Sequence, residues 1–207
     1  MEIAEICRIA PVIPVLIVEE AETAVPLAEA LVAGGLPVIE VTLRTPAALG
    51  ALEAMAKAVP NAIVGAGTLR RAEDVAAVVD AGAQFGVSPG GTAPVLDAAA
   101  AAGLPMLPGV ATPTEALAVA DRGLTTMKFF PAEANGGVPV LKAWASPLAG
   151  LDFCPTGGVG PTNAAAYLAL PNVVCVGGSW VAPSDAVAAG DWGRVEVLAR
   201  DAAALPR

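Results

Sequence analysis

Histidine is absent from this sequence, and aromatic residues are scarce. Of the 207 residues, none is histidine and only 4% are Phe, Trp or Tyr. Without imidazole groups the chain cannot form a Ser-His-Asp triad or a histidine-ligated zinc site, and it cannot use histidine for acid–base catalysis. Any chemistry must therefore depend on lysine, arginine, carboxylates, hydroxyls or the backbone.

Cysteine is also rare, and its positions fit no metal-binding motif. Cys7, Cys154 and Cys175 are widely spaced, and their odd number leaves at least one thiol unpaired. Cys154 and Cys175 lie in strand-like apolar runs, where a free cysteine behaves as a small buried hydrophobic residue. The sequence therefore predicts buried thiols in a reducing compartment.

Basic clusters and long apolar runs are lacking as well. The chain has 11 Lys and Arg against 20 Asp and Glu, which gives a net charge of −9. This balance argues against nucleic acid or an anionic membrane surface as a partner. No apolar run reaches the roughly 18 residues that span a bilayer, and the N-terminal segment is acidic rather than signal-like. We expect a soluble, cytoplasmic protein.

Short apolar runs alternate with alanine-rich, helix-like stretches along the whole chain. The runs predict eight strands, at 12–18, 38–43, 62–66, 83–88, 104–108, 125–130, 151–155 and 173–177. The stretches between them predict eight helices, at 20–34, 46–58, 70–81, 92–102, 113–121, 137–145, 162–169 and 183–204. Left-handed C-caps are expected where glycines follow the helical pattern, at Gly34, Gly82, Gly103 and Gly123.

This alternation is typical of parallel strands joined by helical crossovers. Because no linker or charge run divides the chain, the pattern predicts one (β/α)₈ barrel domain over residues 1–207. The alternative is an open doubly wound sheet, but the G-x-G-x-x-G turn expected after its first strand is missing. In a barrel, the functional site lies at the C-terminal ends of the strands.

One lysine lies in a strand-like run. Lys57 and Lys142 belong to helical contexts with exposed faces, whereas Lys128 lies near the end of TTMKFF. Burying an ammonium group costs several kcal/mol unless it is paired or deprotonated. A lysine becomes a nucleophile when desolvation or a neighbouring charge lowers its pKa. Lys128 is therefore either an imine-forming residue or half of a structural ion pair.

One carboxylate is embedded in the same way. Glu40 lies inside VIEVTL, with Arg44 just beyond it, whereas nearly all other acidic residues fall in helices or loops. We expect Glu40 and Lys128 to meet across the barrel interior, where each changes the charge of the other. Such a pair combines an imine-forming amine with a proton-transferring carboxylate. A structural ion pair of Glu40 with Lys128 or Arg44 is the alternative.

Two glycine pairs follow late strands, in CPTGGVGP (154–161) and VGGSW (176–180). Glycines let backbone N–H groups face an anion, and the loops after the seventh and eighth strands of barrels often bind phosphate. A single Gly-Gly is usually only a turn. Two pairs at matching strand ends, with the hydroxyl of Ser179 added, predict a phosphate site.

Several longer segments resemble the signature segments of the bacterial KDPG/KHG aldolase family. They are EVTLRT (40–45), AIVGAGT (62–68), SPG (88–90), KFFPAEANGG (128–137), FCPTGGV (153–159) and VGGSW (176–180), and they occur in order over essentially the whole chain. The resemblance implies a class I aldolase on a (β/α)₈ barrel that needs no metal or cofactor and is usually a homotrimer. Such enzymes cleave 2-keto-3-deoxy-6-phosphogluconate to pyruvate and glyceraldehyde 3-phosphate in the Entner–Doudoroff pathway. Some members also cleave 4-hydroxy-2-oxoglutarate.

The resemblance also implies a role for each matching residue. Lys128 would form the Schiff base, and Glu40 would move protons. The remaining expected positions are Arg44 and Thr68 at the substrate carboxylate, Thr156 near the C4 hydroxyl, Pro89 and Phe130 in the pocket wall, and Gly157, Gly158, Gly178 and Ser179 at the phosphate. An arginine binds a carboxylate well because its N–H groups match the two oxygens.

Departures from the family pattern are modest and touch none of these residues. They are Leu69, the Arg70-Arg71 pair and Val159-Gly160. Two other functions stay open on the residues alone. One is a different phospho-sugar barrel enzyme, an isomerase or a decarboxylase, that shares the glycine phosphate site. The other is a non-catalytic phosphate-binding or assembly protein in which Glu40 and Lys128 form a structural ion pair.

Overall fold

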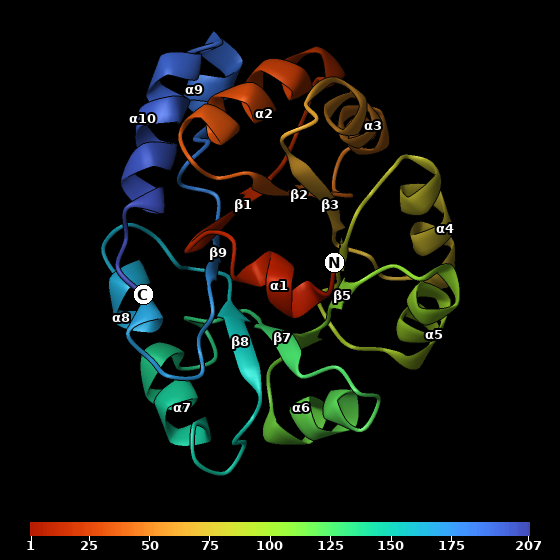
Figure 1. Ribbon diagram of the computed structural model, residues 1–207, viewed down its shortest axis with the longest axis vertical. Helices are drawn as coiled ribbons and strands as arrows, with labels where there is room; N and C mark the ends of the chain where they lie inside the picture. The colour runs from red at the N-terminus through yellow and green to blue at the C-terminus, as the bar shows by residue number, and fades with distance from the viewer.

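Parallel strands lie at the centre of the molecule, and helices surround them (Figure 1). The computed structural model describes residues 1–207. Its strands are β1 (Val12–Leu16), β2 (Val38–Thr42), β3 (Ile63–Gly67), β4 (Gly86–Val87), β5 (Met106–Leu107), β6 (Gly109–Val110), β7 (Thr126–Phe129), β8 (Asp152–Pro155) and β9 (Val176–Gly178). Every named pairing between them is parallel, so the predicted parallel α/β architecture is confirmed.

The helices alternate with the strands along the chain. They are α1 (Ile3–Cys7), the 3₁₀ turn η1 (Ala21–Thr23), α2 (Ala24–Ala33), α3 (Ala48–Ala58), α4 (Ala72–Asp80), α5 (Ala93–Ala102), α6 (Pro113–Ala120), α7 (Gly137–Trp144), α8 (Ala164–Leu168), α9 (Ser184–Ala189) and α10 (Trp192–Ala203). None of them combines the length and the apolar character that a membrane span requires. The helix predicted at 183–204 is wrong as one element, because it breaks into α9 and α10 at Gly190, where φ is +65°.

The strands form a curled arrangement of two sheets. One has the order β5-β4-β3-β2-β1-β9, and the other has the order β6-β7-β8. Pro108 separates β5 from β6, so the strand predicted at 104–108 continues past its expected end as a second short strand. On the other side, single parallel bridges join Phe153 to Val173 and Thr156 to Gly177. The carboxyl ends of the strands therefore gather at one end of the molecule.

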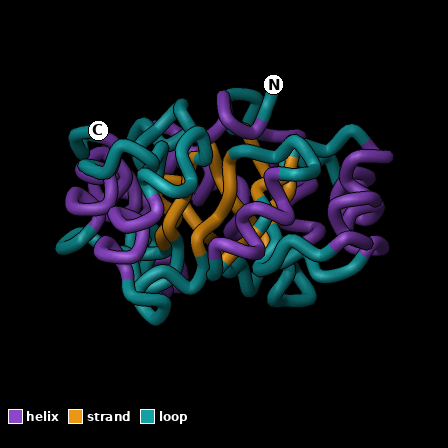
Figure 2. The backbone as a smooth tube through the Cα atoms, turned by 90° about the horizontal axis from the view of Figure 1, so that it is seen from below, coloured by secondary structure: helices purple, strands orange, loops and turns teal.

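Helix α1 covers the opposite end, at the amino ends of the strands, and its residues were not predicted to be helical. Figure 1 places it over the middle of the strands, and the C-terminus reaches the same end (Figure 2). There the Arg207 guanidinium donates a hydrogen bond of 2.8 Å to the carbonyl oxygen of Arg8. Ile3, Ile6 and Cys7 of α1 pack among inward-facing side chains of the strands. The interior is thus closed to water at this end.

Strand residues alternate between two hydrophobic layers. On β2, Val38 points inward and packs in the same apolar cluster as the α1 side chains. Ile39 and Val41 point outward and pack against the helices. This alternation follows from the two-residue period of a strand. Because helices cover the outer face and side chains fill the inner one, β2 is buried over its whole length. Glu40 shares the inner face with Val38.

The glycines at the helix ends follow the predicted pattern with one exception. Gly82, Gly103 and Gly123 have positive φ angles of 89°, 65° and 83°, as predicted. At the end of α2, however, Gly34 is right-handed and Gly35 has the positive φ of 93°. The prediction at Gly34 was therefore wrong by one residue, and this glycine has another reason to be present.

Close packing between α2 and α10 explains Gly34. A Cβ atom at this position would lie 2.4 Å from the Cβ of Ala199 and 2.7 Å from the carbonyl oxygen of Glu196. Both atoms belong to α10, and backbone atoms cannot move aside cheaply. The glycine therefore sets how closely the last helix packs on the second.

We expect the Gly34→Ala substitution to lower the free energy of unfolding by about 1–3 kcal/mol, the usual cost of overpacking. Urea denaturation checks this value. Gly50 in α3 is the matched control, because a Cβ there meets no atom within 4 Å. Gly50→Ala should raise stability by up to about 1 kcal/mol, since alanine favours a helix more than glycine. Equal effects of the two substitutions would contradict the packing argument.

Candidate active site

Lys128 and Glu40 meet inside the curled strands. The Lys128 Nζ atom of β7 donates a hydrogen bond of 3.3 Å to Oε1 of Glu40 on β2. The two side chains are only 4% and 3% exposed. The predicted meeting of the embedded amine with the embedded carboxylate is therefore confirmed. The alternative pairing of Glu40 with Arg44 is wrong, because no salt bridge or hydrogen bond joins them.

The Lys128 nitrogen has one hydrogen-bond partner within the protein. Its one hydrogen bond goes to Glu40, although an ammonium group can donate three. The ring of Phe130 lies 5.2 Å from Nζ, which is a cation–π distance. A buried charge with a single partner is costly to maintain. The arrangement thus favours a reactive amine over a fully satisfied structural ion pair.

Glycine on β3 makes room for the Glu40 carboxylate. A Cβ atom at Gly67 would lie 2.0 Å from Oε1 of Glu40 and 2.7 Å from its carboxyl carbon. Gly65, two residues earlier on β3, leaves space in the same way for the ring of Phe85. A Cβ atom at Gly65 would lie 2.4 Å from that ring. The absence of these two side chains therefore sets how far Glu40 can reach across the interior.

Arg44 and Thr68 lie together just beyond β2 and β3. The Nε of Arg44 donates a hydrogen bond of 3.1 Å to Oγ1 of Thr68. Thr68 has a φ of +66° and is the single non-glycine residue in the left-handed region. For a β-branched residue this conformation is strained, by an amount of order 1–3 kcal/mol. Strain of this kind is often held at functional sites, and here it fixes the hydroxyl that Arg44 contacts.

Thr156 and Pro89 border the same interior. Thr156 is 6% exposed, and its hydroxyl donates a weak hydrogen bond of 3.4 Å to the carbonyl oxygen of Cys154. In the strand register, Lys128 lies between Gly109 on one side and Cys154 on the other. Pro89 passes so close to Gly109 that a Cβ there would lie 2.3 Å from the Pro89 carbonyl oxygen. Both residues thus lie on strands or loops next to Lys128.

The first predicted phosphate loop has left-handed backbone at both of its glycines. Gly157 and Gly158 have φ angles of 97° and 78°. The backbone N–H groups of Gly157, Gly158 and Val159 donate to no backbone acceptor in the protein. Consecutive N–H groups left free in this way form a concave surface that binds anions.

In the second predicted phosphate loop, Gly178 and Ser179 have different surroundings. Gly178 lies against the Trp180 indole, which would meet a Cβ at 1.8 Å, so this glycine is needed for the tryptophan. Ser179 is exposed and lines a cavity of about 540 Å³, formed mainly by the segments that follow β1 and β9 and by α9. The bridge between Thr156 and Gly177 holds this loop beside the first one. The acidic residues Glu19, Glu20 and Asp185 also line the cavity.

Residues 3–198 match the family model for KDPG and KHG aldolases. The chain belongs to this family. It is 54% identical over 192 residues to a KHG/KDPG aldolase of Escherichia coli K12. The matched region covers 93% of this chain and 90% of that protein. It is 48% identical over 206 residues to the 2-dehydro-3-deoxy-phosphogluconate aldolase of Zymomonas mobilis, with 100% and 97% covered.

Solved structures of KDPG aldolases agree with this assignment. The enzyme from Legionella pneumophila, with pyruvate captured as a covalent carbinolamine intermediate, has a TM-score of 0.96 at 43% identity and covers 99% of each chain. The Zymomonas mobilis enzyme with 3-phosphoglycerate has a TM-score of 0.93 at 48% identity, with 98% and 95% covered. The predicted family resemblance is therefore confirmed over nearly the whole chain.

The three cysteines of this aldolase-family chain come together, which the sequence did not predict. Cys7, Cys154 and Cys175 are free and buried. Hydrogen bonds of the Cys175 thiol with Cys154 and Cys7, followed by burial, raise its pKa well above its usual range. The predicted buried thiols are thus confirmed. They contact one another across α1, β8 and the segment before β9, and no spacing in the sequence indicates that contact.

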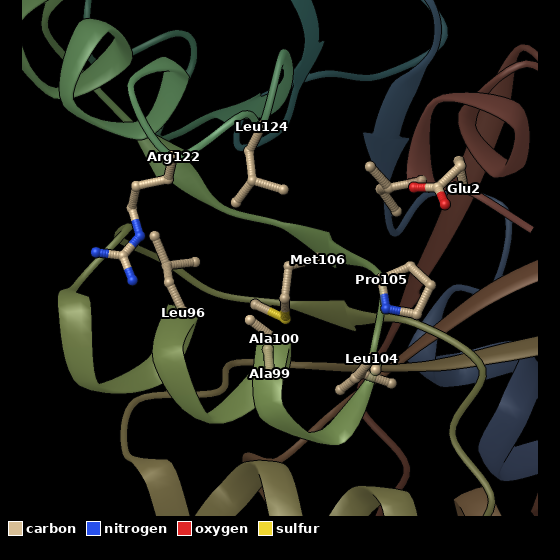
Figure 3. Close-up of a pocket in the computed structure, with 11 residues that line it drawn as sticks. Glu2, Leu96, Ala99, Ala100, Leu104, Pro105, Met106, Arg122 and Leu124 are labelled. Atoms are coloured by element: carbon tan, nitrogen blue, oxygen red, sulfur yellow. The ribbon is translucent and has the colours of Figure 1, made fainter.

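A second cavity lies away from the Lys128–Glu40 pair. Figure 3 shows apolar side chains of α5 and β5 around it, with Glu2 and Arg122 at its edge. Its volume is also about 540 Å³, and it contains none of the residues expected to bind substrate. Arg122 pairs with Asp97 on α5. Because Leu104 and Pro105 precede β5, this cavity opens toward the amino ends of the strands.

We expect Gly67→Ala to leave the protein folded but to displace the Glu40 carboxylate from Lys128. The atom that a new methyl group would meet is the end of a flexible side chain, so the strands can stay in place. If Glu40 transfers protons as predicted, its displacement should lower kcat by about 100-fold or more. Steady-state kinetics and circular dichroism measure the two effects. Gly50→Ala should change neither, and full activity of Gly67→Ala would contradict the argument.

Proposed function

We propose that this chain is a class I aldolase that cleaves 2-keto-3-deoxy-6-phosphogluconate to pyruvate and glyceraldehyde 3-phosphate through an imine on Lys128. The observation that carries the proposal is the buried contact of 3.3 Å between Lys128 and Glu40 in a member of this family. In imine chemistry the protonated imine is the electron sink, so no metal is needed.

The two residues divide the chemistry between them. The neutral Lys128 amine attacks the C2 carbonyl carbon, and Glu40 moves the protons that convert the carbinolamine to a protonated imine with loss of water. The imine withdraws electrons when the C4 hydroxyl loses its proton to Glu40, so the C3–C4 bond breaks. Glyceraldehyde 3-phosphate leaves, and the bond electrons remain in an enamine. Protonation at C3 and hydrolysis then release pyruvate and restore the lysine.

The neighbouring residues place the substrate on this pair. We assign the carboxylate to Arg44 and Thr68, which already contact each other at 3.1 Å. Thr156 serves the C4 hydroxyl, and Pro89 and Phe130 form walls of the pocket. The phosphate position is assigned to Gly157, Gly158, Gly178 and Ser179.

Substrate breadth follows the relatives. The Escherichia coli relative is named for both the KHG and the KDPG activity. The Legionella pneumophila structure holds pyruvate as a covalent carbinolamine. We therefore include 4-hydroxy-2-oxoglutarate as a second substrate, because it offers the same 2-keto acid to Lys128 without a phosphate.

We also infer the architecture and assembly that the family implies. The strands form a closed (β/α)₈ barrel in one domain, a view supported by the bridges from Phe153 to Val173 and from Thr156 to Gly177. The assembly is a homotrimer. The site of action is the cytoplasm, in keeping with the three free thiols.

Trapping with pyruvate and borohydride tests the function. Reduction fixes the imine, and peptide mass spectrometry should find the adduct on Lys128. Lys128→Ala should form no adduct and lose turnover, whereas Lys57→Ala and Lys142→Ala should keep both. Lys57 is a suitable control because it lies on the surface in an ion pair with Glu53.

The same experiment separates the other two functions. An isomerase or decarboxylase that shares the glycine loops would bind phosphate but form no adduct with pyruvate. A non-catalytic phosphate-binding protein would form no adduct and cleave no substrate. Absence of the Lys128 adduct in the wild-type protein would therefore overturn the aldolase assignment.

A further inference from the structure

We propose that Glu133 and Tyr167 are positioning residues that hold the glycine loop after β8 in its phosphate-binding shape. The pair contributes to affinity for the phosphorylated end of the substrate and leaves the imine chemistry unchanged. This inference rests on the proposed function, because it concerns the phosphate end of the same site.

The loop is held through its carbonyl groups. The carbonyl oxygens of Thr156, Gly157 and Gly158 each accept one hydrogen bond, from Ala132 N–H at 2.8 Å, Glu133 N–H at 3.1 Å and Asn163 Nδ2 at 3.1 Å, respectively. All three donors lie outside the loop, in the segment after β7 or at the start of α8. With the carbonyls occupied on these sides, the free N–H groups of Gly157, Gly158 and Val159 are available to an anion.

The Glu133 side chain supports the loop as well. A Cβ atom at Gly158 would lie 2.6 Å from Cγ and 2.7 Å from Cβ of Glu133. The stem of the glutamate therefore occupies the space that a side chain at Gly158 would need. Gly158 is thus pressed directly against Glu133, and the position of this side chain sets the position of the loop.

Tyr167 fixes Glu133 in turn. The hydroxyl group of Tyr167, on α8, donates a hydrogen bond to Oε1 of Glu133. Tyr167 is fully buried, and burial followed by this hydrogen bond raises its pKa above the usual range. The hydroxyl therefore keeps its proton and remains a donor at working pH. Tyr167 is the single tyrosine of the chain.

The start of α7 contacts the same pair. A Cβ atom at Gly137, the first residue of α7, would lie 3.0 Å from both Glu133 Oε1 and Tyr167 Oη. A carboxylate at a helix N-terminus is favoured by the helix dipole. The Glu133 carboxylate therefore joins α7, α8 and the loop. Glu133 is itself exposed, so without the Tyr167 hydroxyl its side chain would be free to take other rotamers.

Preorganised N–H groups bind an anion better than groups that must first be ordered. Tyr167→Phe removes one hydroxyl and should weaken binding of inorganic phosphate by about 3- to 10-fold, the range of one hydrogen bond. KM for the phosphorylated substrate should rise by a similar factor, while kcat changes less. Glu133→Ala should have at least the same effect, whereas Glu133→Gln should keep most of the affinity because its amide oxygen accepts from Tyr167.

The measurements are phosphate binding by calorimetry, steady-state kinetics, and the rate of pyruvate trapping at Lys128. Pyruvate carries no phosphate, so its trapping rate should equal the wild-type rate in every variant. Asn172→Ala is the matched control, because it removes a buried hydrogen bond of 2.9 Å to Leu141 toward the amino ends of the strands. It should leave phosphate affinity unchanged.

Two results would overturn the inference. One is unchanged phosphate affinity in both Tyr167→Phe and Glu133→Ala. The other is an equal loss of phosphate affinity and of pyruvate trapping, which indicates general damage to the fold. Failure of the proposed function has a different signature, namely no pyruvate adduct in the wild-type protein. The comparison of phosphate affinities remains readable in that case because it requires no turnover.

Discussion

A buried contact between one amine and one carboxylate determines how the rest of the site is arranged. Lys128 and Glu40 come from β7 and β2, which are not neighbours in either sheet, and they meet at 3.3 Å only because the strands curl around a common interior. Each group compensates the other, since either one alone would be an unpaired charge out of water. The site is therefore a property of the curled strands rather than of any local segment.

Space inside the strands is as important as charge. Gly65 and Gly67 carry no side chains, so Phe85 can fill the lower interior and Glu40 can extend across the upper one. Helix α1 closes the amino end, which leaves the carboxyl end as the way in for a substrate. At that end lie the strained Thr68 backbone and the glycine loop with its free N–H groups, to which we assign the anionic ends of the substrate. Packed apolar side chains thus fill the interior near the amino ends of the strands, whereas the polar groups lie near the carboxyl ends.

Much of the fold was predictable because strand and helix periods are local. The predicted strand runs all overlap observed strands, and the outward and inward alternation on β2 follows the pattern of its residues. The errors have identifiable causes. Pro108 lacks an N–H group and splits a strand that continues beyond it, and Gly190 breaks a helix that its flanking residues favour. Gly34 serves contact with α10, which no local pattern can reveal.

The sequence by itself determined the residue types and their order: a lysine and a glutamate in apolar strands, glycines after late strands, and a match to one enzyme family. These features are local, so they can be recognised without coordinates. Only the tertiary structure decided which groups touch. Three contacts join distant parts of the chain. Glu40 meets Lys128, Arg44 meets Thr68, and Glu133 and Tyr167 support Gly158. Such contacts depend on how far each strand curls and where each helix packs, and no periodic pattern in the sequence encodes those distances.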